Sequence, residues 1–230
     1  QLRGAAAITE ELIAEEEPLP DPLFPPAMEP NAVFYGGTDP GRFVPTYMIY
    51  SARVRPDVFL ITQNALADNT YMATMRALYA DLIWMPTPAD SANAFRIYVD
   101  EVNSGKRPRN AELVIQNGRV QVSGALGVME INGILCEMIW RNNNFRHAFY
   151  VEESYVISWM YPYFTPHGLI MKLNNEQGPI AQDVVTADLD FWDWYWRRLT
   201  RDTRYRRDVV AQKSFSKLRG AIGGLYVAHG

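Results

Sequence analysis

Short apolar runs alternate with segments of helical periodicity over the first half of the chain, and this alternation restricts the possible folds more than any other feature. The apolar runs are residues 32–35, 57–62 and 82–85, and the segments with helical spacing are residues 43–52, 67–79 and 91–102. Runs of this length, bounded by Gly, Pro or Asn, are typical of strands buried on both faces. A β-α-β-α-β order with right-handed crossovers gives a parallel sheet with helices on its faces. We therefore predict an α/β fold, a Rossmann-like three-layer domain with a mostly parallel sheet.

The second half of the chain predicts different elements. Asn117-Gly118 lies between two apolar runs, which indicates a β-hairpin inserted at the edge of the sheet. Further elements are expected as a helix over 127–141, strands over 148–152 and 169–173, and helices over 187–200 and 208–228. A short helix over 5–17 and a proline-rich linker over 18–30 precede the fold. The expected organisation is 1–30 as helix and linker, 31–180 as the α/β domain and 181–230 as C-terminal helices.

Composition excludes several classes of protein. A chain of 230 residues with 48% hydrophobic content can bury one substantial core. Its net charge of -4 argues against a nucleic-acid binder, which needs clustered excess Lys and Arg. Cys136 is the single cysteine, so neither a disulfide framework nor a thiolate metal site can form. Apolar neighbours on both sides of Cys136 predict a buried structural thiol.

The turn between the first strand and the first helix is rich in glycine. It reads Gly36-Gly37-Thr38-Asp39-Pro40-Gly41-Arg42, and it lies where open α/β sheets bind ligands. Neither the dinucleotide pattern G-x-G-x-x-G nor a P-loop Lys is present, so NAD and ATP are disfavoured and no cofactor is predicted. Asp39 could bind sugar hydroxyls or a metal and Arg42 an anion. Alternatively, Thr38 and Asp39 only shape and cap the turn.

Polar side chains also follow the second strand. Asn64, Asp68 and Asn69 should lie beside the glycine-rich turn, because parallel strands end at one edge of the sheet. Capping of the helix that begins near residue 67 explains Asn64 or Asp68 equally well. The predicted ligand-binding residues are Gly36, Gly37, Asp39, Arg42, Asn64 and Asp68, without a metal or a catalytic group among them.

Other reactive side chains do not form a recognisable catalytic set. Glu152 and Glu153 are neighbours in a strand and point to opposite faces. His147, His167 and His229 lack a nucleophile at recognisable spacing and are expected in solvent or in turns.

Two features of the C-terminal region have competing explanations. The aromatic run at residues 191–196 spreads around a helix, so most of its rings should pack inward and one or two remain exposed. Nine basic residues between Arg197 and Arg219 indicate a solvated helix pair or, alternatively, contact with anionic lipid.

Several segments, taken in order, resemble large bacterial membrane proteins related to protein O-mannosyltransferases. The turn and its flanks, residues 31–45, look like that family's Gly-Asp-Asn-Asp-Thr-Phe-Pro motif. Arg55-Pro56-Asp57-Val58 resembles its Arg-x-Asp-Val strand opening, and residues 168–173 resemble its Gly-Leu-x-Tyr-Arg-Leu. Phe149-Tyr150-Val151 matches as well. In this chain Gly37 and Thr38 replace the first acidic residue and the Asn of the motif, which leaves Asp39 as the only carboxylate.

The resemblance implies an extracytoplasmic domain of a membrane glycosyltransferase that uses a lipid-linked sugar. The family's presumed catalytic acid lies in a membrane-proximal loop that precedes these segments, so this chain is expected to be a non-catalytic accessory part. Its partners would be a glycan or polypeptide acceptor, with membrane attachment through an N-terminal region. Residues 214–230 look like the start of tetratricopeptide-like repeats.

Two alternatives come from other classes of protein. A stand-alone enzyme acting on a small phosphorylated or glycosylated substrate would need Asp39 and Glu152 as its acid and base. A protein-interaction scaffold would instead use the C-terminal helices, and a large exposed cluster of Trp side chains would favour it.

Overall fold

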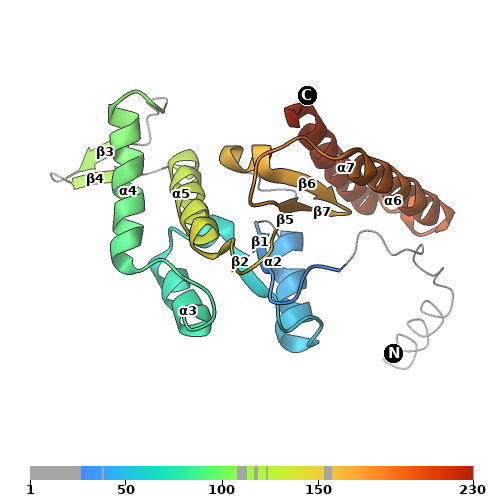
Figure 1. Ribbon diagram of the computed structural model, residues 1–230, viewed down its shortest axis with the longest axis horizontal. Coiled ribbons are helices and arrows are strands. Elements are labelled where there is room, and N and C mark those ends of the chain that lie inside the picture. The colour runs from blue at the N-terminus through green and yellow to red at the C-terminus, as the bar shows by residue number, and fades with distance from the viewer. Residues whose placement is uncertain are drawn as a thin grey trace.

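One five-stranded sheet forms the centre of the molecule, with strand order β2-β1-β5-β7-β6 (Figure 1). The computed structural model describes residues 27–37, 39–107, 113–116, 119–122, 124–152 and 157–229, with the backbone alone at 39–41, 113–116, 119 and 120. The strands of this sheet are β1 (Val33–Gly36), β2 (Phe59–Thr62), β5 (Phe149–Glu152), β6 (Phe164–His167) and β7 (Ile170–Leu173). β1 is parallel to β2 and β5, and β7 runs antiparallel between β5 and β6. The prediction of a mixed α/β fold with a mostly parallel sheet is confirmed.

Helices occupy most of the remaining described chain. They are α2 (Asp39–Thr46), η1 (Tyr47–Ser51), η2 (Gln63–Ala65), α3 (Asn69–Tyr79), α4 (Pro88–Asn103), α5 (Ala125–Asn143), η3 (Ser158–Tyr163), α6 (Gln182–Arg201), η4 (Tyr205–Arg207) and α7 (Val209–His229). The predicted helix over 5–17 and most of the linker over 18–30 lie outside the described residues.

The two faces of the sheet bury two separate groups of side chains. Val33 and Tyr35 point into a large cluster with apolar residues of α3, α4, α5, α6 and α7. Phe34, between them, points to the opposite face and joins a smaller cluster with Ile49 of η1 and Tyr150 of β5. Successive strand residues point to opposite faces, so a strand buried on both sides needs an unbroken apolar run.

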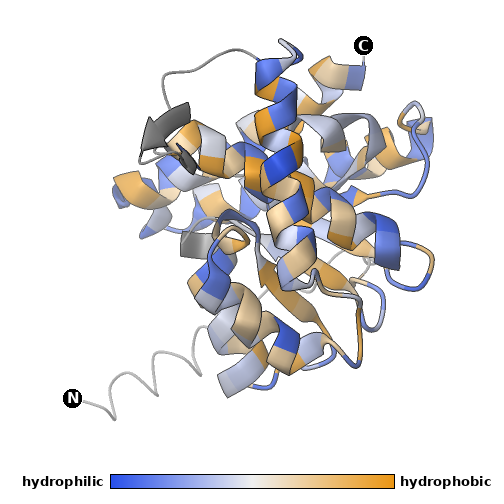
Figure 2. Cartoon of the chain, turned by 90° about the vertical axis from the view of Figure 1, so that its left-hand side faces the viewer, coloured by the Kyte–Doolittle hydropathy of each residue, from blue (hydrophilic) through white to orange (hydrophobic). Residues whose placement is uncertain are grey.

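The local sequence of helix α4 explains where this helix begins and which side of it is buried. Thr87 accepts a hydrogen bond from Asp90 N while the Asp90 carboxylate accepts one from Thr87 N, so the two residues form a capping box. Ala94, Tyr98 and Val102 recur at helical spacing and are buried. In Figure 2, where α4 faces the viewer, its ribbon alternates between hydrophilic and hydrophobic colours. One stripe of α4 therefore faces the core.

The predicted strand over residues 82–85 is wrong. Ile83 and Met85 are buried as expected, but the backbone of Trp84 has no strand partner. Asn143 of α5 takes that place: its Oδ1 accepts from Trp84 N at 2.8 Å and its Nδ2 donates to Trp84 O at 3.0 Å. A buried backbone must pair its polar groups, and here a side chain does so. The place beside β1 is filled by β5.

Two further predictions need correction in detail. The hairpin forms from β3 (Leu113–Gln116) and β4 (Arg119–Val122), but as a two-stranded sheet of its own and not as an edge of the main sheet. The sequence pattern also missed β6, since Pro166 lies inside it. β6 is the last strand of the sheet, and an edge strand tolerates the missing N–H of a proline.

The first helix begins earlier than predicted. α2 starts at Asp39 and not at residue 43, so Pro45 lies in its interior. Proline cannot donate the usual hydrogen bond within a helix, and α2 changes at Tyr47 to a π-helical turn that ends at Ser51.

Candidate ligand-binding site

The carboxyl ends of three parallel strands meet beside the glycine-rich turn. Gly36 of β1 pairs in register with Thr62 of β2, and the preceding Tyr35 pairs with Val151 of β5. Gly37 N donates a hydrogen bond of 3.1 Å to Glu152 Oε2, and both residues are buried. The first residue after β1 is thus fixed against the last residue of β5. We call this region, from Gly36 and Thr62 to Glu152, the carboxyl edge.

Arg42 lies on the exposed side of this edge. Its guanidinium carbon is 5.2 Å from the centroid of the Phe43 ring, an arrangement typical of a cation–π contact. Burial raises the pKa of the Tyr71 hydroxyl, while the hydrogen bond from Thr62 and the charge of Arg42 act to lower it. Tyr71 Oη accepts from Thr62 N at 2.6 Å, which joins α3 to the end of β2. Asp39 begins α2, and its side chain lies outside the described part of the structure.

The remaining predicted residues have different roles. Asn64 lies in η2 and is exposed. Asp68 is the N-cap of α3, and its Oδ1 accepts from Tyr71 N at 2.7 Å. Such a cap satisfies a helix donor that would otherwise lack a partner. The capping alternative therefore explains Asp68. Gly36 and Gly37 have structural contacts of their own at the carboxyl edge, and Arg42 and Asn64 are exposed.

Three buried polar residues near this edge were not predicted as site residues. Glu152 is 5% exposed, Gln63 is fully buried, and Asn132 of α5 is 1% exposed. Asn132 Oδ1 accepts from Ala67 N at 2.7 Å, and its Nδ2 has no hydrogen-bond partner within the described part of the chain. A polar residue inside an apolar run was the available signal, as for Asn132 in the middle of the predicted helix over 127–141.

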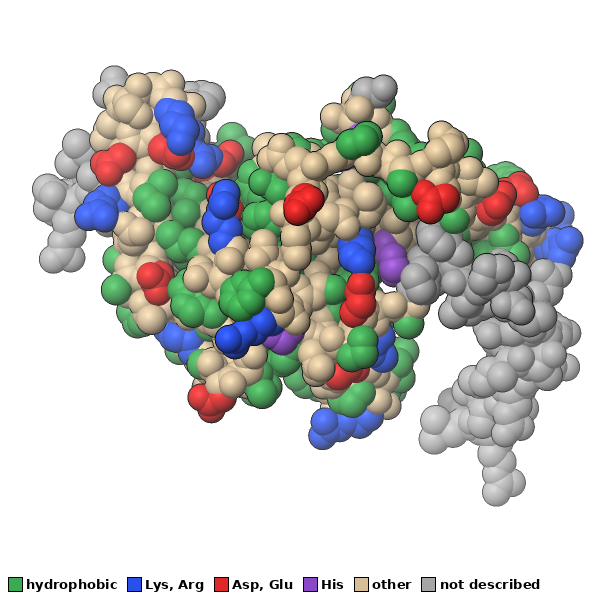
Figure 3. Space-filling model, viewed as in Figure 1, with side chains coloured by type: hydrophobic (Ala, Val, Ile, Leu, Met, Phe, Trp, Pro, Cys, Tyr) green, Lys and Arg blue, Asp and Glu red, His purple; other side chains and the backbone are tan. Residues whose placement is uncertain are grey.

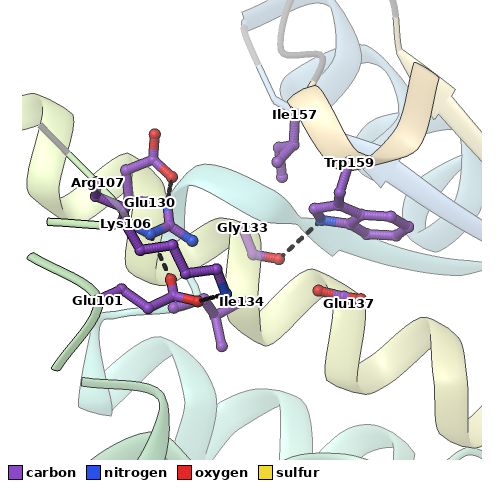
Figure 4. A pocket seen from close by; sticks show the side chains of 9 residues that line it. All are labelled: Glu101, Lys106, Arg107, Glu130, Gly133, Ile134, Glu137, Ile157 and Trp159. Carbon is purple, nitrogen blue, oxygen red and sulfur yellow. Dashed lines mark hydrogen bonds and ion pairs between the residues drawn. The ribbon is translucent and has the colours of Figure 1, made fainter. Parts of the chain in front are cut away.

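A cavity of about 350 Å³ lies where α5 meets the end of α4 and the segment after β5 (Figure 4). Glu101, Lys106, Arg107 and Glu130 line one side of it, and Ile157 and Trp159 line the other. Trp159 Nε1 donates to Gly133 O at 3.1 Å, which fixes the aromatic wall to the helix.

The charges of this cavity are paired with one another. Arg107 lies between Glu101, at 2.5 Å, and Glu130, while Lys106 also contacts Glu101. Hydrogen bonds from Lys106 and Arg107 lower the pKa of the Glu101 carboxyl. A charged ligand would have to displace these partners, so the cluster is better explained as a connection between α4 and α5. On the face drawn in Figure 3, acidic and basic side chains are likewise interspersed.

The three histidines make structural contacts. The expectation of a turn position is wrong for His167, whereas His147 lies in a bend after a turn and is only partly buried. His167 is a strand residue of β6 and is 9% exposed, and its ring centroid lies 4.8 Å from that of Tyr150 in a tilted arrangement. His147 Nδ1 lies 2.7 Å from Asn31 O, and His229 Nε2 lies 3.0 Å from Tyr161 O. None is poised beside a nucleophile among the contacts described.

The predicted thiol and aromatic features are confirmed. Cys136 is fully buried, and burial raises the pKa of its thiol. Phe191 and Trp192 are buried, Trp194 and Tyr195 are partly buried, and Trp196 is 49% exposed. Within this run only Trp196 is an exposed Trp, so the run does not form the large exposed Trp cluster that would favour a protein-interaction scaffold.

The basic C-terminal residues are partly paired. Arg197 bonds Asp193 at 2.7 Å, and Arg204 bonds Asp202 at 2.8 Å. Ion pairs of this kind suit a solvated helix pair.

The fold and the carboxyl edge together define a mixed α/β protein with a candidate ligand site at the ends of its parallel strands. Comparisons of the chain with protein-family models, curated proteins and solved structures found no match. Among the described residues, no three His, Cys, Asp or Glu side chains are placed to hold a metal ion. None of the helices in the described ranges is both long and apolar enough to cross a bilayer.

Proposed function

We propose that this chain is a non-catalytic accessory domain of a membrane glycosyltransferase-like protein, acting at the extracytoplasmic face and recognising a glycan or polypeptide acceptor. The observation that supports it is the carboxyl edge, where Gly36 pairs with Thr62 and Gly37 bonds Glu152, and where Arg42 and Asn64 are exposed in the helices that follow β1 and β2. Ligands of open, Rossmann-like α/β sheets bind outside the carboxyl ends of parallel strands. In the same proposal, α6 and α7 begin a tetratricopeptide-like array.

The chemistry of the edge suits a polar ligand that carries one anionic group. Arg42 offers a planar set of donors to a carboxylate or phosphate, and the exposed amide of Asn64 both donates and accepts. Glycine lets a ligand approach the backbone closely, as at Gly36. Glu152 would act indirectly, because its carboxylate holds Gly37 N and fixes the backbone at the turn.

Binding of acceptor peptides and of a glycan array to the chain tests the proposal. Arg42→Gln and Asp39→Asn should each weaken binding about tenfold, since hydrogen bonds to charged groups contribute roughly 1.5–3 kcal/mol. Lys213→Gln and Asp183→Asn change the same charges on α7 and α6, at exposed positions, and serve as matched controls. No binding at millimolar concentration, together with unchanged sugar transfer by the full-length Asp39→Asn and Arg42→Gln variants, would overturn the site assignment.

Asp68 allows recognition to be separated from capping. Asp68→Ser keeps an N-cap oxygen and removes the charge, whereas Asp68→Ala removes both. If Asp68 only caps α3, Asp68→Ala lowers the free energy of unfolding by about 1 kcal/mol and neither variant alters binding. Loss of binding in Asp68→Ser with unchanged stability would instead place Asp68 in the ligand site.

A further inference from the structure

A second site is formed by the C-terminal helices, away from the carboxyl edge. An open groove of about 800 Å³ lies between α6, η4 and α7. Its walls carry the aromatic rings of Trp196, Tyr205 and Phe215, and Phe215 lies 5.4 Å from Trp196 and 6.4 Å from Tyr205, centroid to centroid. The volume lies within the range of small-molecule sites, which is roughly 300–1,000 Å³.

Arg219 lines the groove, and one of its N–H donor groups lacks a hydrogen-bond partner among the described residues. That group is Nη1, which is shielded from solvent. The nearest acid is Asp188, whose Oδ2 lies 3.7 Å away and already accepts from Tyr226 Oη at 2.9 Å. Asp188 Oδ1 accepts from Trp192 Nε1 at 3.1 Å. An arginine presents five N–H donors in a fork that matches a carboxylate or phosphate.

The other residues that line the groove also favour a negatively charged ligand. Arg206 is exposed at the rim and adds a second positive charge, and no acidic residue is among those that line the groove. Thr200, Gln212 and Ser216 supply polar groups between the aromatic walls. Gln212 Nε2 donates to the carbonyls of Tyr205 and Arg206 at 3.0 Å, which fixes η4 against α7.

We propose that this groove binds a small organic anion that carries a ring, with the carboxylate or phosphate held by Arg219 and Arg206 and the ring packed against Trp196 and Phe215. Aromatic walls bind the flat face of a sugar, an alicyclic or an aromatic ring through apolar contact. The anionic group then accepts hydrogen bonds from the exposed part of Arg219, whose side chain is 39% exposed, and from Arg206 at the rim.

The test is calorimetric titration of the 230-residue chain with 1-naphthoate, 1-naphthyl phosphate and neutral 1-naphthol. We expect one or both anions to bind, and naphthol to bind at least about tenfold more weakly. The tighter of the two anions identifies the preferred acidic group. Trp196→Ala should weaken the binding of every probe that binds, because it removes a wall of the groove.

The arginine variants test the anion contact itself. Arg206→Gln and Arg219→Gln should each weaken anion binding about tenfold. Arg207→Gln makes the same charge change at the neighbouring exposed residue, outside the groove, and should leave the affinity unchanged. Arg206 is exposed, so its variant is expected to fold even if Arg219→Gln does not. The proposal is overturned if neither anion binds at millimolar concentration, if naphthol binds as tightly as the anions, or if Arg207→Gln weakens binding as much as Arg206→Gln.

Discussion

Gly37 donates its backbone N–H to the buried carboxylate of Glu152, joining the end of β1 to the end of β5 across 115 positions of sequence. Replacing Glu152 by Ala leaves a buried donor without this acceptor, which costs about 1–3 kcal/mol of the free energy of unfolding. Glu152→Gln keeps a carbonyl oxygen and should lose less. Urea denaturation measures both, and Glu176→Ala, at an exposed position, is the control. Equal stability of the Ala variant and the wild type would contradict a structural role for this bond.

Asn143 is expected to hold the segment that the sequence predicts as a strand. Its side chain satisfies both the N–H and the carbonyl of Trp84 and is 3% exposed. Asn143→Ala removes both partners and should lower the free energy of unfolding by roughly 2 kcal/mol or more. The neighbouring exposed Asn142, whose Nδ2 donates to Met138 O, provides the matched control Asn142→Ala. A loss of the same size in both variants would show that helix propensity, and not the contact with Trp84, is responsible.

Two glycines should respond oppositely to substitution by alanine. A Cβ at Gly133 would lie 3.0 Å from Ile157 Cγ2, whereas a Cβ at Gly223 meets nothing within 4 Å. Both are helical, and alanine gains up to about 1 kcal/mol over glycine in a helix interior. Gly223→Ala should therefore raise the melting temperature and Gly133→Ala should lower it. The double variant Gly133→Ala/Ile157→Ala should lose less stability than the two single variants together predict, and simple additivity would refute the clash.

The free energy of unfolding should depend on pH through two carboxyl groups, those of Glu29 and Asp57. Hydrogen bonds from Arg55 and from Asn31 N lower the pKa of the Asp57 carboxyl. Burial would raise the pKa of the Glu29 carboxyl, but hydrogen bonds from Lys172 and Tyr150 outweigh it and lower that pKa to about 2. Carboxyls with lowered pKa values stabilise the fold fully above their unfolded pKa of about 4, and this contribution is lost as the pH falls through the folded values.

Denaturant unfolding between about pH 6 and pH 2 measures this dependence. The free energy of unfolding should fall toward low pH, and Asp57→Asn should make that fall shallower. Asp183→Asn, on the exposed first turn of α6, should leave the slope as it is. A slope unaffected by Asp57→Asn would show that other carboxyls carry the pH dependence.

Local sequence patterns predicted the helices and the hairpin, which depend mainly on interactions between residues close together in the sequence. Apolar residues at helical spacing place α3, α4, α5, α6 and α7 close to their predicted positions, and Asp68 and Thr87 cap helices where such residues are expected. The Asn-Gly pair lies between two strands that do form a hairpin. Largely apolar runs also identify β1, β2 and β5, because strands buried on both faces need apolar side chains at nearly every position.

Tertiary structure alone decided which apolar segments pair and what surrounds them. Residues 82–85 have the composition of a strand, but Asn143 satisfies Trp84, while β6 forms despite Pro166 because it lies at an edge. The tertiary structure also decides which residues meet at the carboxyl edge and in the groove at Arg219. Glu152 meets Gly37, and Arg219 lies beside Asp188, only after segments distant in sequence have packed. Pairing and burial depend on contacts that no local pattern encodes, so the helices can be predicted from the sequence while the partners of these side chains cannot.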